Sequence, residues 1–71
     1  MWRKGVRMKS LKIGERLVEL RGQRTQTEVA KANDISVSAL AMYETGQRIP
    51  RDEVKVRLAN YYKTTVQELF F

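Results

Sequence analysis

The chain contains neither cysteine nor histidine among its 71 residues. The absence of cysteine excludes disulfide bonds, and the absence of both residue types excludes the usual structural zinc sites. It also removes the side chain that most often performs acid–base catalysis. No Gly-rich phosphate loop occurs, and no pair of acids has an evident pocket. We therefore expect a protein that is not an enzyme and that uses no metal or cofactor.

Long apolar runs are also missing, because none approaches the roughly 18 residues that a membrane-spanning helix needs. The first residues are basic, but no apolar stretch follows them as it would in a signal peptide. The sequence thus predicts no membrane partner, and no small-molecule ligand is evident from it. Its 71 residues allow one domain. A domain of this size buries only about 60% of the surface of its unfolded chain, so dimerisation would help its stability.

Acidic residues are absent before Ile13, although the whole chain carries 8 of them against 14 basic residues. Five of the basic residues lie in this stretch, namely Arg3, Lys4, Arg7, Lys9 and Lys12. Residues 1–11 are therefore predicted to form a flexible basic tail, and residues 12–71 the folded domain. The tail is either a solvated segment or an arm that adds salt-dependent phosphate contacts. That Met8 is the physiological start is a further hypothesis, which N-terminal sequencing of the native protein tests.

Apolar residues recur at helical spacing at the start of the domain. Ile13, Leu17 and Leu20 form a stripe, which Val18 extends. This pattern predicts an amphipathic helix of about ten residues, with Gly22 ending it.

The next segment opens with Thr25 and Glu28 in the pattern T-x-x-E, which is a capping box at a helix start. Asn33 and Asp34 are expected to stop this second helix, because both residue types tolerate left-handed backbone. A short polar break therefore follows a short helix.

Ser36 is the N-cap candidate of a third helix over residues 37–44. Gly46 suits the C-cap of that helix, and Pro50 lies too close for it to continue. Two short helices joined by a tight turn form a helix-turn-helix unit.

Two acids follow Pro50, at the start of a fourth predicted helix whose dipole favours them. The apolar face of that helix comprises Val54, Leu58, Tyr61 and Tyr62. A second T-x-x-E pattern at Thr65 opens a last short helix, whose apolar residues are Val66, Leu69 and Phe70. The sequence therefore predicts an all-α fold, a compact bundle of five helices without strands.

These segments, taken in order, resemble the lambda-repressor-like, XRE-type (Cro/repressor) family of helix-turn-helix transcriptional regulators. The resemblance covers about residues 12–70 and rests on IGERLVELR, TQTEVA, ISVSALAMYETGQRIP and the endings LANYY and VQELF. Its most specific part is Tyr43-Glu44-x-Gly46 followed by Pro50.

The resemblance implies a DNA-binding domain whose third helix lies in the major groove. It places Gln26 at a phosphate, Val37, Ser38 and Met42 toward base edges, and Gln47 and Arg48 in a loop that grips the backbone. The full predicted DNA-binding set is Gln26, Thr27, Ser36, Val37, Ser38, Ala41, Met42, Gln47 and Arg48.

A helical projection of the third helix gives an independent check. At 100° per residue, Leu40 and Tyr43 share one side, and Ser38, Ala41 and Met42 share the opposite side. We therefore expect the first pair in the core and the second set facing DNA.

Three features depart from the family pattern. The link between Arg21 and Gln26 is about two residues short, which predicts a first helix that ends early or tilts. Asp34 replaces the turn glycine, and Asn33 stands where an apolar residue is common. The third helix also lacks the Arg, Asn and Gln side chains that usually discriminate bases, so specificity should depend on DNA shape, paired half-sites and backbone contacts.

The leading functional prediction is a sequence-specific double-stranded DNA-binding transcriptional regulator, a repressor acting as a homodimer in a bacterial or phage-type cytoplasm. One alternative is a protein-interaction module that keeps the fold without strong DNA binding, and another is an RNA-associated basic domain. Leu69, Phe70 and Phe71 end the chain with more apolar surface than one short helix can bury, so they are predicted to form the dimer interface.

Overall fold

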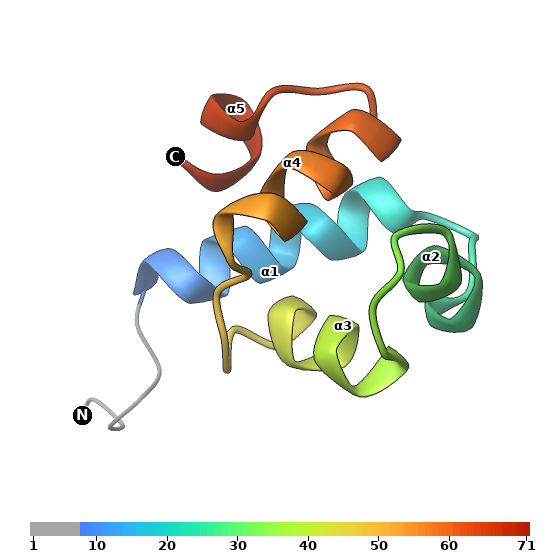
Figure 1. Ribbon diagram of the computed structural model, residues 1–71. Helices are drawn as coiled ribbons and strands as arrows, with labels where there is room; N and C mark the ends of the chain where they lie inside the picture. The colour runs from blue at the N-terminus through green and yellow to red at the C-terminus, as the bar shows by residue number, and fades with distance from the viewer. Residues whose placement is uncertain (1–7) are drawn as a thin grey trace.

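The computed structural model describes residues 8–71 and contains, over that range, five α-helices and no strand (Figure 1). The helices are α1 (Met8–Arg21), α2 (Gln26–Ala32), α3 (Val37–Glu44), α4 (Asp52–Tyr61) and α5 (Val66–Phe70). In Figure 1, α1 runs through the middle of the molecule, with α3 below it and α5 above it. The predicted all-α fold of five helices is confirmed.

Hydroxyl N-caps set the starts of three helices, as the sequence predicts. The side chains of Thr25, Ser36 and Thr65 each accept a hydrogen bond at 3.0 Å from the backbone N–H three residues later. Each bond satisfies one of the unpaired donors at a helix start, so these residues determine where α2, α3 and α5 begin.

One buried core joins all five helices. It is formed by Ile13, Leu17, Val29, Ala30, Leu40, Tyr43, Val54, Leu58, Ala59, Leu69 and Phe70. The projection of α3 is confirmed for the core side, because Leu40 is 0% and Tyr43 only 7% exposed. The opposite side of α3 is consequently free of the core.

The start of α1 differs from the prediction. The helix begins at Met8 and has 14 residues, whereas the periodicity predicted about ten. Ser10 is buried at 6% exposure, so the first turn of α1 packs against the rest of the structure although the sequence placed residues 8–11 in the tail. The remainder of the predicted tail, residues 1–7, lies outside the described residues.

The buried face of α1 also differs in part. Ile13 and Leu17 are buried as predicted, but Val18 and Leu20 are 44% and 37% exposed. At 100° per residue, Ser10, Ile13 and Leu17 fall within about 60° of one another, and Val18 and Leu20 flank this buried stripe on opposite edges. The short link predicted either an early end or a tilt of this helix, and the early end is not seen, since α1 continues to Arg21.

Gly14 lets α1 and α3 approach closely. A Cβ atom there would lie 2.9 Å from the carbonyl carbon of Glu44 and 3.0 Å from the carbonyl oxygen of Tyr43. Any side chain at this position would press on rigid backbone, so the α1–α3 spacing depends on glycine. No helix within residues 8–71 has the length and apolar character needed to cross a membrane.

Candidate nucleic-acid interface

The turn between α2 and α3 is fixed by a buried asparagine. Asn33 is 2% exposed, and its side-chain amide donates to the carbonyl of Val29 at 2.8 Å. Arg57 of α4 donates to the carbonyl of Asn33 at 2.9 Å. Asp34 has φ of +57°, which confirms the left-handed backbone expected where the family carries glycine. These contacts close the end of α2 and attach the turn to α4.

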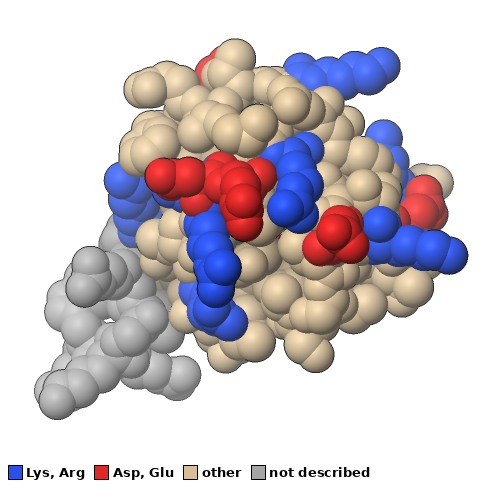
Figure 2. Space-filling view, in the orientation of Figure 1, with Lys and Arg blue, Asp and Glu red and all other residues tan. Residues whose placement is uncertain are grey.

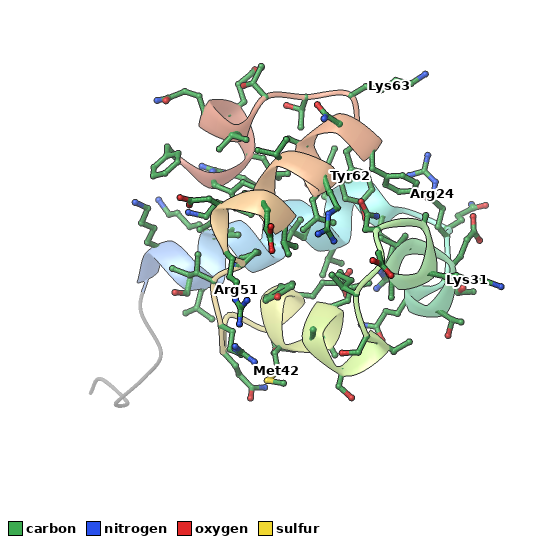
Figure 3. The ribbon with its side chains drawn as sticks, viewed as in Figure 1. Arg24, Lys31, Met42, Arg51, Tyr62 and Lys63 are labelled. Atoms are coloured by element: carbon green, nitrogen blue, oxygen red, sulfur yellow. The ribbon has the colours of Figure 1, made fainter. Side chains whose placement is uncertain are left out.

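The outer face of α3 is uncharged. Ser36, Val37 and Ser38 are exposed, while Ala41 and Met42 are half-buried. Figure 2 shows the lower edge of the molecule, over α3, without a continuous basic patch, and Figure 3 shows Met42 at this edge. Ser36 accepts the N-cap bond from Ala39, whereas the Ser38 hydroxyl makes no hydrogen bond within residues 8–71. Ser38 is therefore the polar group that this face offers to a partner.

A buried carboxylate joins the first three helices. The Glu44 side chain is 3% exposed, and its Oε2 accepts from the Arg21 Nε at 2.8 Å. Its Oε1 accepts from the Gln26 Nε2, also at 2.8 Å. The hydrogen bond to Glu44 raises the pKa of the Arg21 guanidinium above its usual value. Both carboxylate oxygens are thus satisfied, and the Gln26 side chain is held in place at the start of α2.

The loop after α3 is closed by backbone bonds around Gly46, whose φ is +79°. The Gln47 N–H donates to the Met42 carbonyl at 2.9 Å, and the Gln47 side chain donates to the Thr45 hydroxyl at 2.9 Å. Arg48 is exposed and forms no ion pair within residues 8–71. Its guanidinium is free to contact a phosphate.

The helix-turn-helix domain family matches residues 12–69, which is most of the chain. The chain belongs to the helix-turn-helix family. Its structure is similar to the crystal structure of the restriction-modification controller protein C.AhdI from Aeromonas hydrophila, with a TM-score of 0.81 and 29% sequence identity. The similarity covers 90% of this chain and 100% of C.AhdI. No curated protein sequence gives a significant match.

These findings confirm the resemblance drawn from the sequence to XRE-type helix-turn-helix regulators. They identify the chain as a DNA-binding transcriptional regulator. Within residues 8–71, no group of three or more acidic side chains is placed to hold a metal ion.

The helix-turn-helix brings the predicted DNA-binding residues to two ends of α3. Ser36, Val37 and Ser38 lie at its start, whereas Gln47 and Arg48 follow its end. Glu44 in the last turn of α3 bonds Gln26, so the start of α2 lies beside the end of α3. The predicted phosphate-contacting residues therefore gather at one end of the helix.

Two of the three residues predicted to form the dimer interface are buried within the single chain. Leu69 and Phe70 are 2% and 1% exposed within the single chain, because α5 packs on the core. Phe71 remains 61% exposed. One short helix therefore buries more of this apolar ending than expected, and of these three residues Phe71 alone stays exposed.

Glu44 and Arg21 were not among the predicted site residues, although a signal for Glu44 existed. On the projection of α3, Glu44 lies about 40° from Leu40 and hence on the core side. A carboxylate there needs a charged partner, because burying it alone is costly. The partner, Arg21, lies 23 positions away and could not be identified from spacing.

Proposed function

We propose that this helix-turn-helix protein is a sequence-specific transcriptional repressor that binds double-stranded DNA as a homodimer through α3. The observation that carries the proposal is the arrangement around α3. An uncharged face, with the free Ser38 hydroxyl near its start, leads to the polar residues Gln26, Gln47 and Arg48 at the end of the helix. This arrangement supports a helix that enters the major groove while the residues beside its end hold the backbone.

Base recognition would come from few side chains. The Ser38 hydroxyl can hydrogen-bond a base edge, while Val37 and Met42 can contact thymine methyl groups. The remaining specificity would come from DNA shape and from the spacing of two half-sites bound by the two copies.

Phosphate contacts would fix the position of α3. The Gln26 side-chain nitrogen carries two hydrogens, of which one is engaged by Glu44. The second is available to a phosphate, as are the backbone N–H groups of Gln26 and Thr27 in the first turn of α2. Arg48 would add a charged contact from the loop that follows α3.

Similarity to C.AhdI supports the regulatory role. That protein is described as a restriction-modification controller protein, and it is matched over its whole length. We propose that the present chain likewise controls the transcription of a restriction-modification system.

The uncharged face of α3 leaves one alternative function, a protein-interaction module without strong DNA binding. Binding to duplex DNA at graded salt distinguishes the two, because a DNA-binding protein loses affinity steeply as salt rises.

Selection of bound duplexes from a random pool would define the operator. With that operator, we expect Ser38→Ala to cost about 1 kcal/mol, and Met42→Ala to reduce the preference for the operator over scrambled DNA. Arg48→Ala should weaken both duplexes about equally, because a phosphate carries no base information. Lys63→Ala is the charge-matched control, and thermal unfolding checks that each variant folds. Altered sequence preference in Arg48→Ala, with unchanged preference in the α3 variants, would contradict this assignment.

A further inference from the structure

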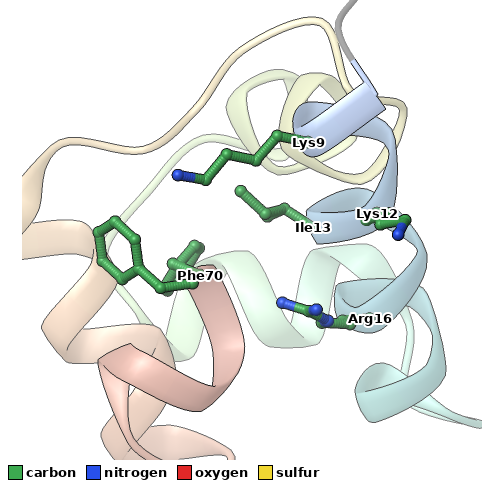
Figure 4. A pocket seen from close by; sticks show the side chains of 6 residues that line it. Lys9, Lys12, Ile13, Arg16 and Phe70 are labelled. Carbon is green, nitrogen blue, oxygen red and sulfur yellow. The ribbon is translucent and has the colours of Figure 1, made fainter.

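A cavity of about 390 Å³ lies between the first turns of α1 and the end of α5 (Figure 4). It is lined by Lys9, Lys12, Ile13, Arg16, Phe70 and Phe71. Ile13 and Phe70 are almost fully buried and supply an apolar floor, while Phe71 is largely exposed. The lining thus combines an apolar floor with three cations.

The cations of this cavity have no acidic partners. Lys9, Lys12 and Arg16 form no ion pair within residues 8–71. Arg16 donates one nitrogen to the backbone carbonyls of Leu69 at 3.1 Å and of Glu68 at 3.4 Å, so its partners are carbonyls at the end of α5 and not an acidic side chain. The Lys9 ammonium lies 4.7 Å from the centre of the Phe71 ring, so its charge is directed over the apolar part of the cavity.

The position of the lysines on α1 is unfavourable for the helix alone. The first turn of α1 contains no acid, and its dipole favours negative charge there. Lys9 and Lys12 instead add positive charge near this end. An anion in the cavity would be attracted by the side chains and by the helix terminus together.

The cavity and the DNA-binding face lie on opposite sides of α1. At 100° per residue, Lys9, Lys12 and Arg16 fall within about 60° of one another on α1. Their mean direction lies about 160° from that of Leu11 and Gly14, the residues that contact the α3 segment. A ligand in the cavity would therefore not obstruct DNA at α3.

We propose that this cavity binds a small organic anion, a carboxylate joined to an aromatic or aliphatic body. The carboxylate would lie among Lys9, Lys12 and Arg16, and the body would cover Ile13 and Phe70. The volume is near the lower end of the range for small-molecule sites, which favours a small ligand over a peptide. This inference goes beyond the proposed function and needs no DNA.

The site brings together residues more than 50 positions apart, since Arg16 and Leu69 are separated by 53 positions. No local sequence pattern could reveal it. It offers this DNA-binding domain a place to receive a metabolic signal.

The test is an NMR titration of the full chain with three probes: 4-phenylbutyrate, the neutral 4-phenylbutyramide and inorganic phosphate. We expect 4-phenylbutyrate to shift the amide signals of residues 9–16 and 69–71. The amide should bind at least fivefold more weakly than 4-phenylbutyrate because it lacks the charge. Phosphate should also bind at least fivefold more weakly, because it lacks the apolar body.

Charge variants provide the second arm. Lys9→Gln combined with Lys12→Gln should weaken 4-phenylbutyrate binding about fivefold, the size expected for two partly exposed charge contacts. The matched control is Lys31→Gln combined with Lys63→Gln, which removes the same charge far from the cavity (Figure 3). Arg16 is left unchanged because it bonds the backbone of α5.

Three outcomes would overturn the proposal. The first is an equal loss of affinity in the two double variants, which would indicate attraction by net charge alone. The second is equal binding of the amide or of phosphate. The third is the absence of shifts at residues 9–16, which would show that the anion does not enter the cavity.

Discussion

The Glu44 carboxylate provides the sharpest test of how this domain is held together. It is 3% exposed and accepts hydrogen bonds from Arg21 and Gln26. The change Glu44→Ala would leave both donors without their partner. It would also leave the Arg21 guanidinium, whose side chain is 20% exposed, without its counter-charge.

The expected cost follows from this burial. Removing one partner of a buried ion pair costs about 3–5 kcal/mol. Because Arg21 retains some contact with solvent, we expect about 2–4 kcal/mol here. A domain of this length has a free energy of unfolding of roughly 4–10 kcal/mol, so the loss is a large fraction of the total. The midpoint of thermal unfolding should fall by more than about 10 °C.

Two further variants separate the charge from the hydrogen bonds. Glu44→Gln keeps the shape and can still pair with both neighbours if the Gln26 amide rotates, so it should cost about half as much as Glu44→Ala. A double-mutant cycle with Arg21→Gln should give a coupling energy of about 1–3 kcal/mol.

Chemical denaturation at low and high salt is the measurement. The buried pair should persist at high salt, because screening acts mainly between exposed charges. A cost below about 1 kcal/mol for Glu44→Ala, or a coupling energy near zero, would refute the reasoning. Under folding conditions, Glu44→Ala should also weaken DNA binding, since Gln26 would no longer be held at the start of α2.

Four other outcomes are expected. Gly14→Ala should destabilise the domain by about 1–3 kcal/mol in denaturation, because its Cβ would meet the backbone of α3; unchanged stability would show that the helices can separate. Burial raises the pKa of Tyr62 to about 12, so stability should be lost as pH rises from about 10 through 12, and Tyr62→Phe should reduce that loss. Sedimentation of Phe71→Ala should show weaker dimerisation; an unchanged monomer–dimer equilibrium would place the interface elsewhere. Deleting residues 1–7 should make the slope of log binding constant against log salt concentration shallower by up to about 2.7. Equal slopes for the truncated and the full chain would show that the deleted residues make no phosphate contact.

The sequence by itself determined where the helices begin and which side of α3 faces the core. Each N-cap side chain accepts a hydrogen bond from the backbone N–H three residues later, as Thr25, Ser36 and Thr65 show. Because this effect is local, the sequence spacing is enough to predict it. Asp34 likewise decides its own backbone conformation. The projection of α3 succeeded because one short, regular helix packs on a single core.

The tertiary structure decided what depends on distant segments. The burial of Leu69 and Phe70 requires α5 to fold back on the core, and the apolar ending alone could not show this. The start of α1 was missed because Ser10 is polar and is buried only by its neighbours. Glu44 has a role only where α1, α2 and α3 meet, and the basic cavity exists only where α1 meets α5. Caps and periodicity act over a few residues, whereas charge pairing and cavities arise from packing between segments that the sequence keeps far apart.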